Sequence, residues 1–137
     1  PNELARMGAA KAWSSWEAHC STMHPNQRLI KHFTNPHRAL ARCKVGTHYF
    51  RNGCFLESNQ IVSNADILKD IPGIIVHGRF DMVCPMENAH TLHEAWPNSQ
   101  LYLVREAGHS ATEPALIDAL IRATRNMSLR FGDGFGD

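Results

Sequence analysis

Hydrophobic positions follow a helical period up to about residue 66 and a mixed pattern beyond it. Ala9, Trp13, Trp16 and Cys20 follow one another at spacings of four, three and four residues. That spacing predicts a helix with these four side chains on one face. The His-Pro-Asn segment at residues 24–26 is expected to end this helix, because proline cannot continue it.

A second helix is predicted to begin at Asn35 and Pro36. Asparagine is a favoured N-cap residue, and proline suits the first helical position after it. An Asn-Gly pair at residues 52–53 is expected to end this helix. The positions that share its apolar face are Leu40, Cys43, Thr47 and Phe50.

Beyond residue 66, short apolar segments alternate with helical patterns. Residues 73–77 form an apolar, β-branched run bounded by glycine, which is typical of a parallel strand covered on both faces. Residues 99–104 predict a second strand, and the pattern from Met86 to Trp96 predicts a helix between the two. The order indicates an α/β unit whose parallel strands are joined by a right-handed crossover.

The last predicted helix begins near Pro114, with Thr112 as a plausible cap. The side chains that we expect it to bury are Leu116, Ile117, Leu120, Ile121 and Thr124. Residues 128–137 are rich in glycine and aspartate and are predicted to form a flexible tail.

Composition excludes several classes of protein. The 137 residues are 43% hydrophobic and 20% charged, which is typical of one globular domain. A net charge of +1 with scattered basic residues argues against a nucleic-acid partner. No apolar run approaches the roughly 18 residues of a membrane span. The four cysteines show no complete zinc spacing, so we predict reduced thiols in a cytoplasmic protein.

Two polar residues follow the predicted strands. In open α/β sheets, function collects at the carboxyl ends of the strands. Asp81 comes just after the first strand and His109 just after the second, so we expect them to lie side by side. A carboxylate beside an imidazole is the acid and base pair of a nucleophilic triad. The alternative is that Asp81 caps a helix and His109 is a turn residue. Gly78 and Gly108, which are expected to allow sharp turns, favour the triad.

The nucleophile of such a triad is missing from the sequence. The G-x-S-x-G motif, which places a serine on a strand-to-helix turn, does not occur in the chain. In α/β-hydrolases the order is serine, acid, histidine, so the serine is expected upstream of Pro1. A first residue other than Met agrees with a piece of a longer protein.

Residues 71–114, "IPGIIVHGRFDMVCPMENAHTLHEAWPNSQLYLVREAGHSATEP", closely resemble the carboxyl-terminal region of the proline iminopeptidases. These α/β-hydrolases remove proline from peptide amino termini. The segments "AAKAWSSWE" (residues 9–17) and "NPHRALARCKVGTHYFRNGCFL" (residues 35–56) resemble the helical cap of that family. The resemblance implies that residues 1–66 are part of the cap and residues 67–127 the carboxyl-terminal part of the α/β-hydrolase domain.

The resemblance also implies roles for four residues. Asp81 corresponds to the triad acid and His109 to the triad base. Glu17 corresponds to a glutamate that receives the substrate ammonium, and Cys84 to a cysteine beside the pocket for the proline ring. Without the resemblance, Glu17 reads as a solvated helix charge and Cys84 as a small buried hydrophobe. Gly46 stands where the family has a second glutamate for the ammonium.

Together these features predict a serine aminopeptidase that acts on peptides with a free N-terminal proline and needs no metal or organic cofactor. This chain alone is expected to be inactive. The alternatives are a hydrolase with relaxed proline selectivity and a non-catalytic binding module that kept the fold. A metal site at His90 and His93 is a third, weaker alternative. The oligomeric state stays open.

Overall fold

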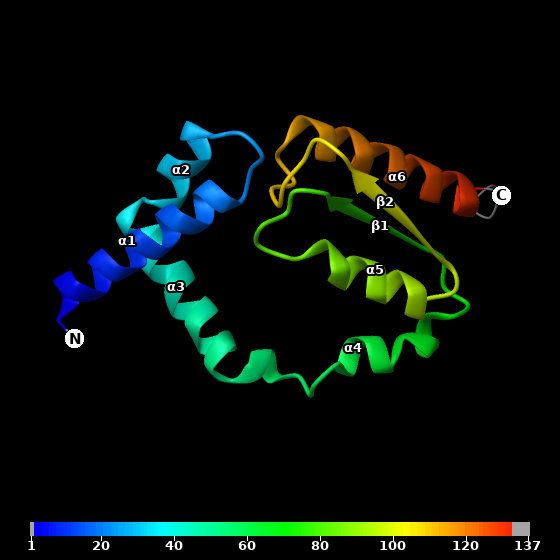
Figure 1. Cartoon of the computed structure of the whole chain (residues 1–137), viewed down its shortest axis with the longest axis horizontal. Coiled ribbons are helices and arrows are strands. Elements are labelled where there is room, and N and C mark those ends of the chain that lie inside the picture. The colour runs from blue at the N-terminus through cyan, green and yellow to red at the C-terminus, as the bar shows by residue number, and fades with distance from the viewer. Residues whose placement is uncertain (1, 133–137) are drawn as a thin grey trace.

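The computed structural model describes residues 2–132, which form a helical part followed by an α/β unit (Figure 1). The helical part contains α1 (Glu3–Cys20), α2 (Gln27–Phe33) and α3 (Pro36–Arg51). The connection contains short helix α4 (Gln60–Ser63) between two 3-10 turns, Gly53–Phe55 and Ala65–Leu68. The α/β unit contains β1 (Gly73–Gly78), α5 (Met86–Ala95), β2 (Ser99–Val104) and α6 (Pro114–Gly132). Each helix and strand predicted from the sequence is present.

Asparagine side chains begin the three helices of the first part. Asn35 Oδ1 accepts the backbone N–H of Arg38 at 3.3 Å, and Pro36 occupies the start of α3, as predicted. Asn2 and Asn26 cap α1 and α2 in the same way. Each cap satisfies an N–H group that has no partner within its own helix.

Helices α1 and α3 approach each other through small side chains. Ala10, Ser14 and Ala18 form the buried stripe of α1, and Ala39 is buried on α3. The Cys43 thiol donates to the Ala10 carbonyl oxygen at 3.6 Å. Small residues let the two backbones come close, so α3 covers this stripe of α1.

The apolar face predicted for α1 is not its buried face. Trp13 and Trp16 are 46% and 58% exposed, and Ala9 is exposed as well. A helical repeat shows which side chains share a face, but the depth of packing depends on which face a neighbouring helix can approach. The alanine and serine stripe beside the tryptophans allows the closer approach.

Strands β1 and β2 pair in parallel, with Gly73 opposite Ser99 and Gly78 opposite Val104. Helix α5 connects them, and Figure 1 shows α5 and α6 on opposite sides of the strands. Within the described residues the sheet has two strands, so each strand has one edge without a partner. The carboxyl ends of both strands lie at the same edge of the unit, because the strands are parallel.

Helix α6 buries less than the sequence predicted. Leu116 is buried, but Ile117, Leu120 and Ile121 are 44%, 38% and 47% exposed, and Thr124 is exposed too. The buried stripe continues through small residues, Ala119 and Ala123. Two strands are too narrow a surface to cover the whole apolar face of a long helix.

Residues 128–132 belong to α6 rather than to the predicted flexible tail, and the rest of that tail lies outside the described residues. The boundary predicted near residue 66 falls in the connecting segment. The assignment of residues 1–66 to a cap domain stays a prediction. No helix within residues 2–132 combines the length and the apolar character that a membrane span requires.

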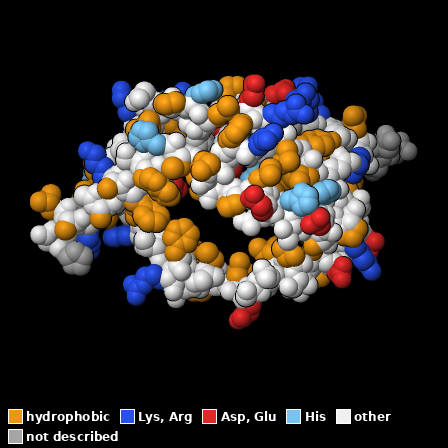
Figure 2. Space-filling view, viewed as in Figure 1, with side chains coloured by type: hydrophobic (Ala, Val, Ile, Leu, Met, Phe, Trp, Pro, Cys, Tyr) orange, Lys and Arg blue, Asp and Glu red, His pale blue; other side chains and the backbone are white. Residues whose placement is uncertain are grey.

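Much apolar surface is uncovered. The accessible surface is 10067 Å², whereas a compact monomer of 15.4 kDa exposes roughly 7,200 Å² by size scaling. Figure 2 shows hydrophobic side chains along the rim of an opening between the helical part and the α4 and α5 side of the molecule. The chain therefore buries less apolar surface than an isolated domain of its size normally does.

Candidate active site

Asp81 and His109 meet at the carboxyl ends of the two strands. Asp81 lies three residues after β1, and His109 lies five residues after β2. His109 Nδ1 is 3.0 Å from Asp81 Oδ2. An ionised carboxylate can only accept, so Nδ1 carries the proton and donates it to Oδ2. This leaves His109 Nε2 as the acceptor nitrogen, and the His109 side chain is 39% exposed.

The Asp81 carboxylate is held on both oxygens. Oδ1 accepts the backbone N–H groups of Val83 at 2.9 Å and Cys84 at 2.8 Å, while Oδ2 accepts from His109. Burial raises the pKa of Asp81, but the hydrogen bonds from Cys84, His109 and Val83 outweigh burial and hold it below its usual value. The bonds therefore stabilise the folded chain above the unfolded pKa of about 3.9, and that stabilisation is lost as the pH falls through the lower folded value.

His77 also belongs to this cluster, although the sequence did not predict it. Its Nε2 donates to the Cys84 carbonyl oxygen at 3.1 Å and lies 3.6 Å from Asp81 Oδ2. These contacts close the loop between β1 and α5 that carries Asp81. The sequence feature that could have identified His77 is its place as a polar residue near the end of an otherwise apolar strand.

A second missed residue, Glu113, holds the loop that carries His109. Its carboxylate accepts the N–H of Gly108 at 2.6 Å and that of Met23 at 2.9 Å. The N–H of Ser110 donates to the Ser21 carbonyl oxygen at 2.7 Å. The bonds to Met23 and Ser21 join the histidine loop to the segment that follows α1, and no sequence spacing could predict them, because these partners lie far apart in the chain.

Gly78 is required for close packing rather than for the sharp turn that the sequence suggested, and Gly108 also lies in a tight position, where a Cβ would come within 3.2 Å of its neighbours. Neither has a positive φ; within the described residues only Gly53 does among the glycines. A Cβ on Gly78 would lie 2.0 Å from the Gly108 carbonyl oxygen. The end of β1 therefore contacts the histidine loop directly, and glycine makes this contact possible.

Replacing Gly78 by alanine is expected to lower the free energy of unfolding by about 1–3 kcal/mol, because the new methyl group overlaps backbone atoms. Gly8→Ala is the matched control, since a Cβ there meets nothing within 4 Å and alanine favours the helix. Urea unfolding of both variants measures the difference. Equal shifts in the two variants would contradict the close contact at Gly78.

Glu17 lies on α1 and is already paired. Its Oε2 accepts from Trp13 Nε1 at 3.0 Å and from the Arg42 guanidinium at 2.8 Å. The guanidinium also lies 3.9 Å over the ring of Phe33. Glu17 and Gly46 line the same small cavity of about 80 Å³, together with Arg42. Gly46, where the resemblance implies a second glutamate, therefore lines the same cavity as Glu17, the residue expected to bind the ammonium.

A larger cavity of about 770 Å³ lies beside His109, between the histidine loop and α2. Phe33 lines this cavity, and Arg42 covers the Phe33 ring. The Arg42–Phe33 pair therefore connects the cavity at His109 with the cavity at Glu17. The four predicted site residues fall into two groups: Asp81, His109 and Cys84 lie together, and Glu17 lies on the helical part.

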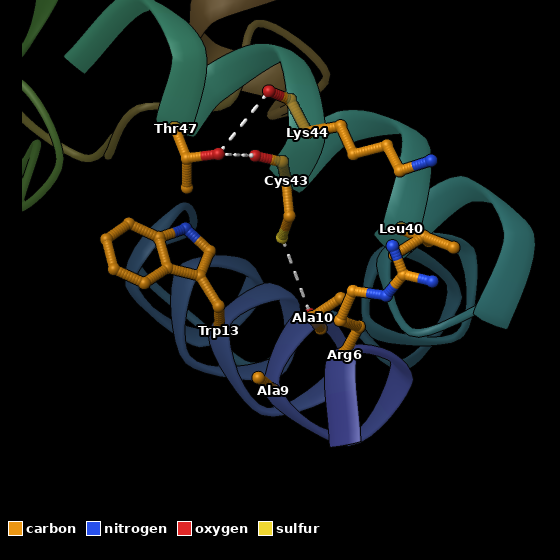
Figure 3. Close-up of a pocket in the computed structure, with 8 residues that line it drawn as sticks. All are labelled: Arg6, Ala9, Ala10, Trp13, Leu40, Cys43, Lys44 and Thr47. Carbon is orange, nitrogen blue, oxygen red and sulfur yellow. Dashed lines mark hydrogen bonds between the residues drawn. The ribbon is translucent and has the colours of Figure 1, made fainter. Parts of the chain in front are cut away.

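A third cavity, of about 290 Å³, lies in the groove between α1 and α3 (Figure 3). Figure 3 shows Cys43 directed toward Ala10, and Thr47 bonded back to its own helix. Trp13 lines this cavity and also the Glu17 cavity. The cavity between α1 and α3 shares no lining residue with the cavity at His109, so it is not part of the Asp81–His109 site.

One trio of metal-ligating types converges within the described residues. Donor atoms of Asp81, Cys84 and His109 all lie within 4.8 Å of one another. Burial raises the pKa of the Cys84 thiol, and the Asp81 charge raises it further. The alternative site at His90 and His93 is not supported, because His90 faces Glu94 at 3.4 Å and His93 bonds the Ser99 hydroxyl at 2.7 Å.

Sequence comparison finds known proteins that match most of the chain. The proline iminopeptidase of Xylella fastidiosa (strain 9a5c) is 48% identical over 124 residues, which is 90% of this chain. The chain is related to the proline iminopeptidases. That of Arabidopsis thaliana is 37% identical over 125 residues. The resemblance stated from the sequence is therefore confirmed. The chain spans 40% of the X. fastidiosa protein and 33% of the A. thaliana protein.

The fold comparison agrees. An esterase from Exiguobacterium antarcticum superposes on 91% of this chain and 46% of its own, with a TM-score of 0.53 at 19% identity. That likeness shows the fold alone, and it confirms the predicted class, part of an α/β-hydrolase fold. No family model matches the chain.

Proposed function

We propose that this chain supplies the acid and the base of a serine-type aminopeptidase that releases proline from peptide amino termini. The observation that carries the proposal is the 3.0 Å contact between His109 Nδ1 and Asp81 Oδ2 in a chain related to the proline iminopeptidases. The nucleophilic serine and the oxyanion hole would come from protein outside this sequence. A hydrolase of this type needs no metal or organic cofactor.

The proposed reaction uses His109 twice. His109 Nε2 takes the serine hydroxyl proton as the serine oxygen attacks the proline carbonyl, and then gives that proton to the leaving amine. In the second half, Nε2 takes a proton from water as the water oxygen attacks the acyl carbonyl, and then gives that proton to the serine oxygen as the acyl bond breaks and proline is released. Asp81 keeps the proton on Nδ1 and stabilises the imidazolium that forms twice. The half-exposed His109 ring lies at the wall of the 770 Å³ cavity, where a substrate has room to approach it.

Glu17 is the proposed partner of the substrate ammonium. Both of its hydrogen bonds end on Oε2, which leaves Oε1 for the substrate. Arg42 already neutralises part of the Glu17 charge, and Gly46 supplies no second carboxylate. The ammonium is therefore held less tightly than by two free glutamates, which supports an enzyme with relaxed proline selectivity. Cys84, next to Asp81, stays the proposed neighbour of the proline ring.

A non-catalytic binding module that kept the fold is the second candidate, and the presence or absence of G-x-S-x-G in the intact protein distinguishes the two. A peptide as the reaction partner is proposed from the relatives' name. The expected lack of nucleic-acid and membrane partners and a cytoplasmic location stay predictions.

The test uses a hybrid enzyme, in which this chain replaces the matching region of the X. fastidiosa protein. The hybrid is expected to hydrolyse L-proline p-nitroanilide and to leave N-acetylproline p-nitroanilide uncut, because a blocked amine carries no charge for Glu17. The 137-residue chain alone is expected to show no hydrolysis, since a triad acts as a unit. A hybrid that folds, as judged by circular dichroism, but stays inactive would support the non-catalytic module.

A further inference from the structure

We propose that Asp81, Cys84 and His109 form a binding site for Zn²⁺, and that the bound ion switches off the acid–base pair. The donor atoms of these three side chains lie within 4.8 Å of one another at the carboxyl ends of the strands. The site itself follows from this geometry alone. Only its consequence for catalysis rests on the function proposed above.

The three donors need only small movements to reach zinc geometry. Zinc bonds of about 2.0–2.3 Å at tetrahedral angles place neighbouring donors about 3.3–3.6 Å apart. The 3.0 Å distance between His109 Nδ1 and Asp81 Oδ2 has to lengthen by a few tenths of an ångström. The Cys84 sulfur, which lies within 4.8 Å of the other two donors, has to approach them by about 1 Å at most. Cys84 is exposed and the His109 side chain is 39% exposed, so both can rotate.

The carboxylate is already oriented as a ligand. The N–H groups of Val83 and Cys84 hold Asp81 Oδ1 and turn Oδ2 toward His109. His77 holds the same loop by donating a hydrogen bond to the Cys84 carbonyl oxygen. Outer bonds of this kind orient metal ligands and typically account for about 10- to 100-fold in affinity.

The chemistry of the donors selects zinc over the common hard cations. Thiolate and imidazole are ligands of Zn²⁺, whereas Mg²⁺ and Ca²⁺ take oxygen donors. A thiolate and a carboxylate together balance the two charges of the ion. Three protein ligands leave a fourth position for water, and the exposed side of His109 gives the ion access.

Zinc binding and triad function exclude each other at His109. The ion takes the Nδ1 position, so the imidazole proton moves to Nε2, and the Cys84 thiol proton leaves to solvent. An imidazole with its proton on Nε2 cannot accept the serine proton. The Nδ1–H bond to Asp81, which fixes the productive tautomer, is lost at the same time.

The test titrates the 137-residue chain with Co²⁺, whose absorption reports the ligands, and then with Zn²⁺ in competition. The expected result is a thiolate-to-cobalt charge-transfer band with intense visible bands of a four-coordinate ion, both displaced by Zn²⁺. Cys84→Ser and His109→Gln are expected to weaken zinc binding by at least about 100-fold, since they remove ligands rather than outer partners. Circular dichroism checks that each variant keeps the fold.

Cys54→Ser and His90→Gln are the matched controls, because both residues are exposed and lie outside the trio. They are expected to bind Co²⁺ and Zn²⁺ like the original chain. Unchanged affinity in Cys84→Ser, or equal loss in Cys54→Ser, would overturn the site.

The state of His109 can be tested without any activity. In chain labelled with ¹⁵N histidine, zinc is expected to shift the His109 Nδ1 resonance and to place the proton on Nε2. Binding with the proton still on Nδ1 would overturn the switch. An inactive hybrid enzyme would overturn the proposed function and leave the metal site standing, so the two failures are distinguishable.

Discussion

Replacing Asp81 by asparagine in the hybrid enzyme is expected to lower kcat by about 10⁴-fold, because the productive tautomer of the histidine is lost. The side chain of Asp81 is 5% exposed and accepts the His109 Nδ1–H at 3.0 Å. An asparagine of the same shape can present its N–H₂ group to Nδ1, which then accepts, and the proton moves to Nε2. That tautomer cannot take the serine proton. The change in kcat on L-proline p-nitroanilide measures the effect.

His109→Gln is expected to cost at least as much, and the double variant little more than either single variant, because residues of a triad act as a unit. Asp118→Asn is the matched control. Asp118 is exposed on α6 and pairs with Arg122, so its loss is expected to leave kcat within a factor of about two, as surface changes usually do. A loss below about tenfold in Asp81→Asn would show that Asp81 does not orient the base.

Replacing Glu17 by glutamine is expected to lower kcat/KM for the free-amine substrate by about 10- to 150-fold. Loss of a charge-assisted contact costs about 1.5–3 kcal/mol, and each 1.36 kcal/mol is tenfold. The variant removes the carboxylate proposed to face the substrate and leaves Arg42 without its 2.8 Å partner, so an uncompensated cation would remain beside the ammonium. Steady-state kinetics on L-proline p-nitroanilide measure the loss.

Gly46→Glu is the complementary change. A Cβ at Gly46 meets nothing within 4 Å, and the residue lines the Glu17 cavity, so a glutamate there starts without a clash and adds a second carboxylate beside Glu17. It is expected to raise kcat/KM and the preference for a free amine. Glu57→Gln is the matched control for Glu17→Gln, because Glu57 is an exposed residue of the connecting segment. Equal kinetics of Glu17→Gln and the control would remove Glu17 from the proposed substrate site.

The sequence predicted the elements of the fold well, because its signals were local. Asn35 and Pro36 marked the start of α3, and the glycine-bounded apolar run marked β1. The meeting of Asp81 and His109 followed from one general rule, that parallel strands bring their carboxyl ends together. These features depend on a few neighbouring residues and on the chain order.

Burial was predicted less well, because it depends on distant segments. Ile117, Leu120 and Ile121 lie on an apolar face of α6 that two strands cannot cover. Trp13 and Trp16 lie beside, rather than on, the stripe that α3 reaches. Periodicity identifies apolar faces, but it does not tell which of them finds a neighbour.

The contacts that support the site were also missed for this reason. Arg42 reaches Glu17 across 25 positions of the chain, and Glu113 reaches Met23 across 90. His77 was hidden in a strand whose apolar character dominated its interpretation. Partners such as Arg42 and Glu113 become visible only in the folded structure, where segments distant in the chain lie side by side.

The kcat/KM of the hybrid enzyme on L-proline p-nitroanilide measures whether this chain's Asp81 and His109 can serve a serine from a relative. We expect a value within about 150-fold of that of the X. fastidiosa protein, the shortfall coming from the second carboxylate that the resemblance implies and that Gly46 lacks. A correctly folded hybrid with no hydrolysis above background would contradict it.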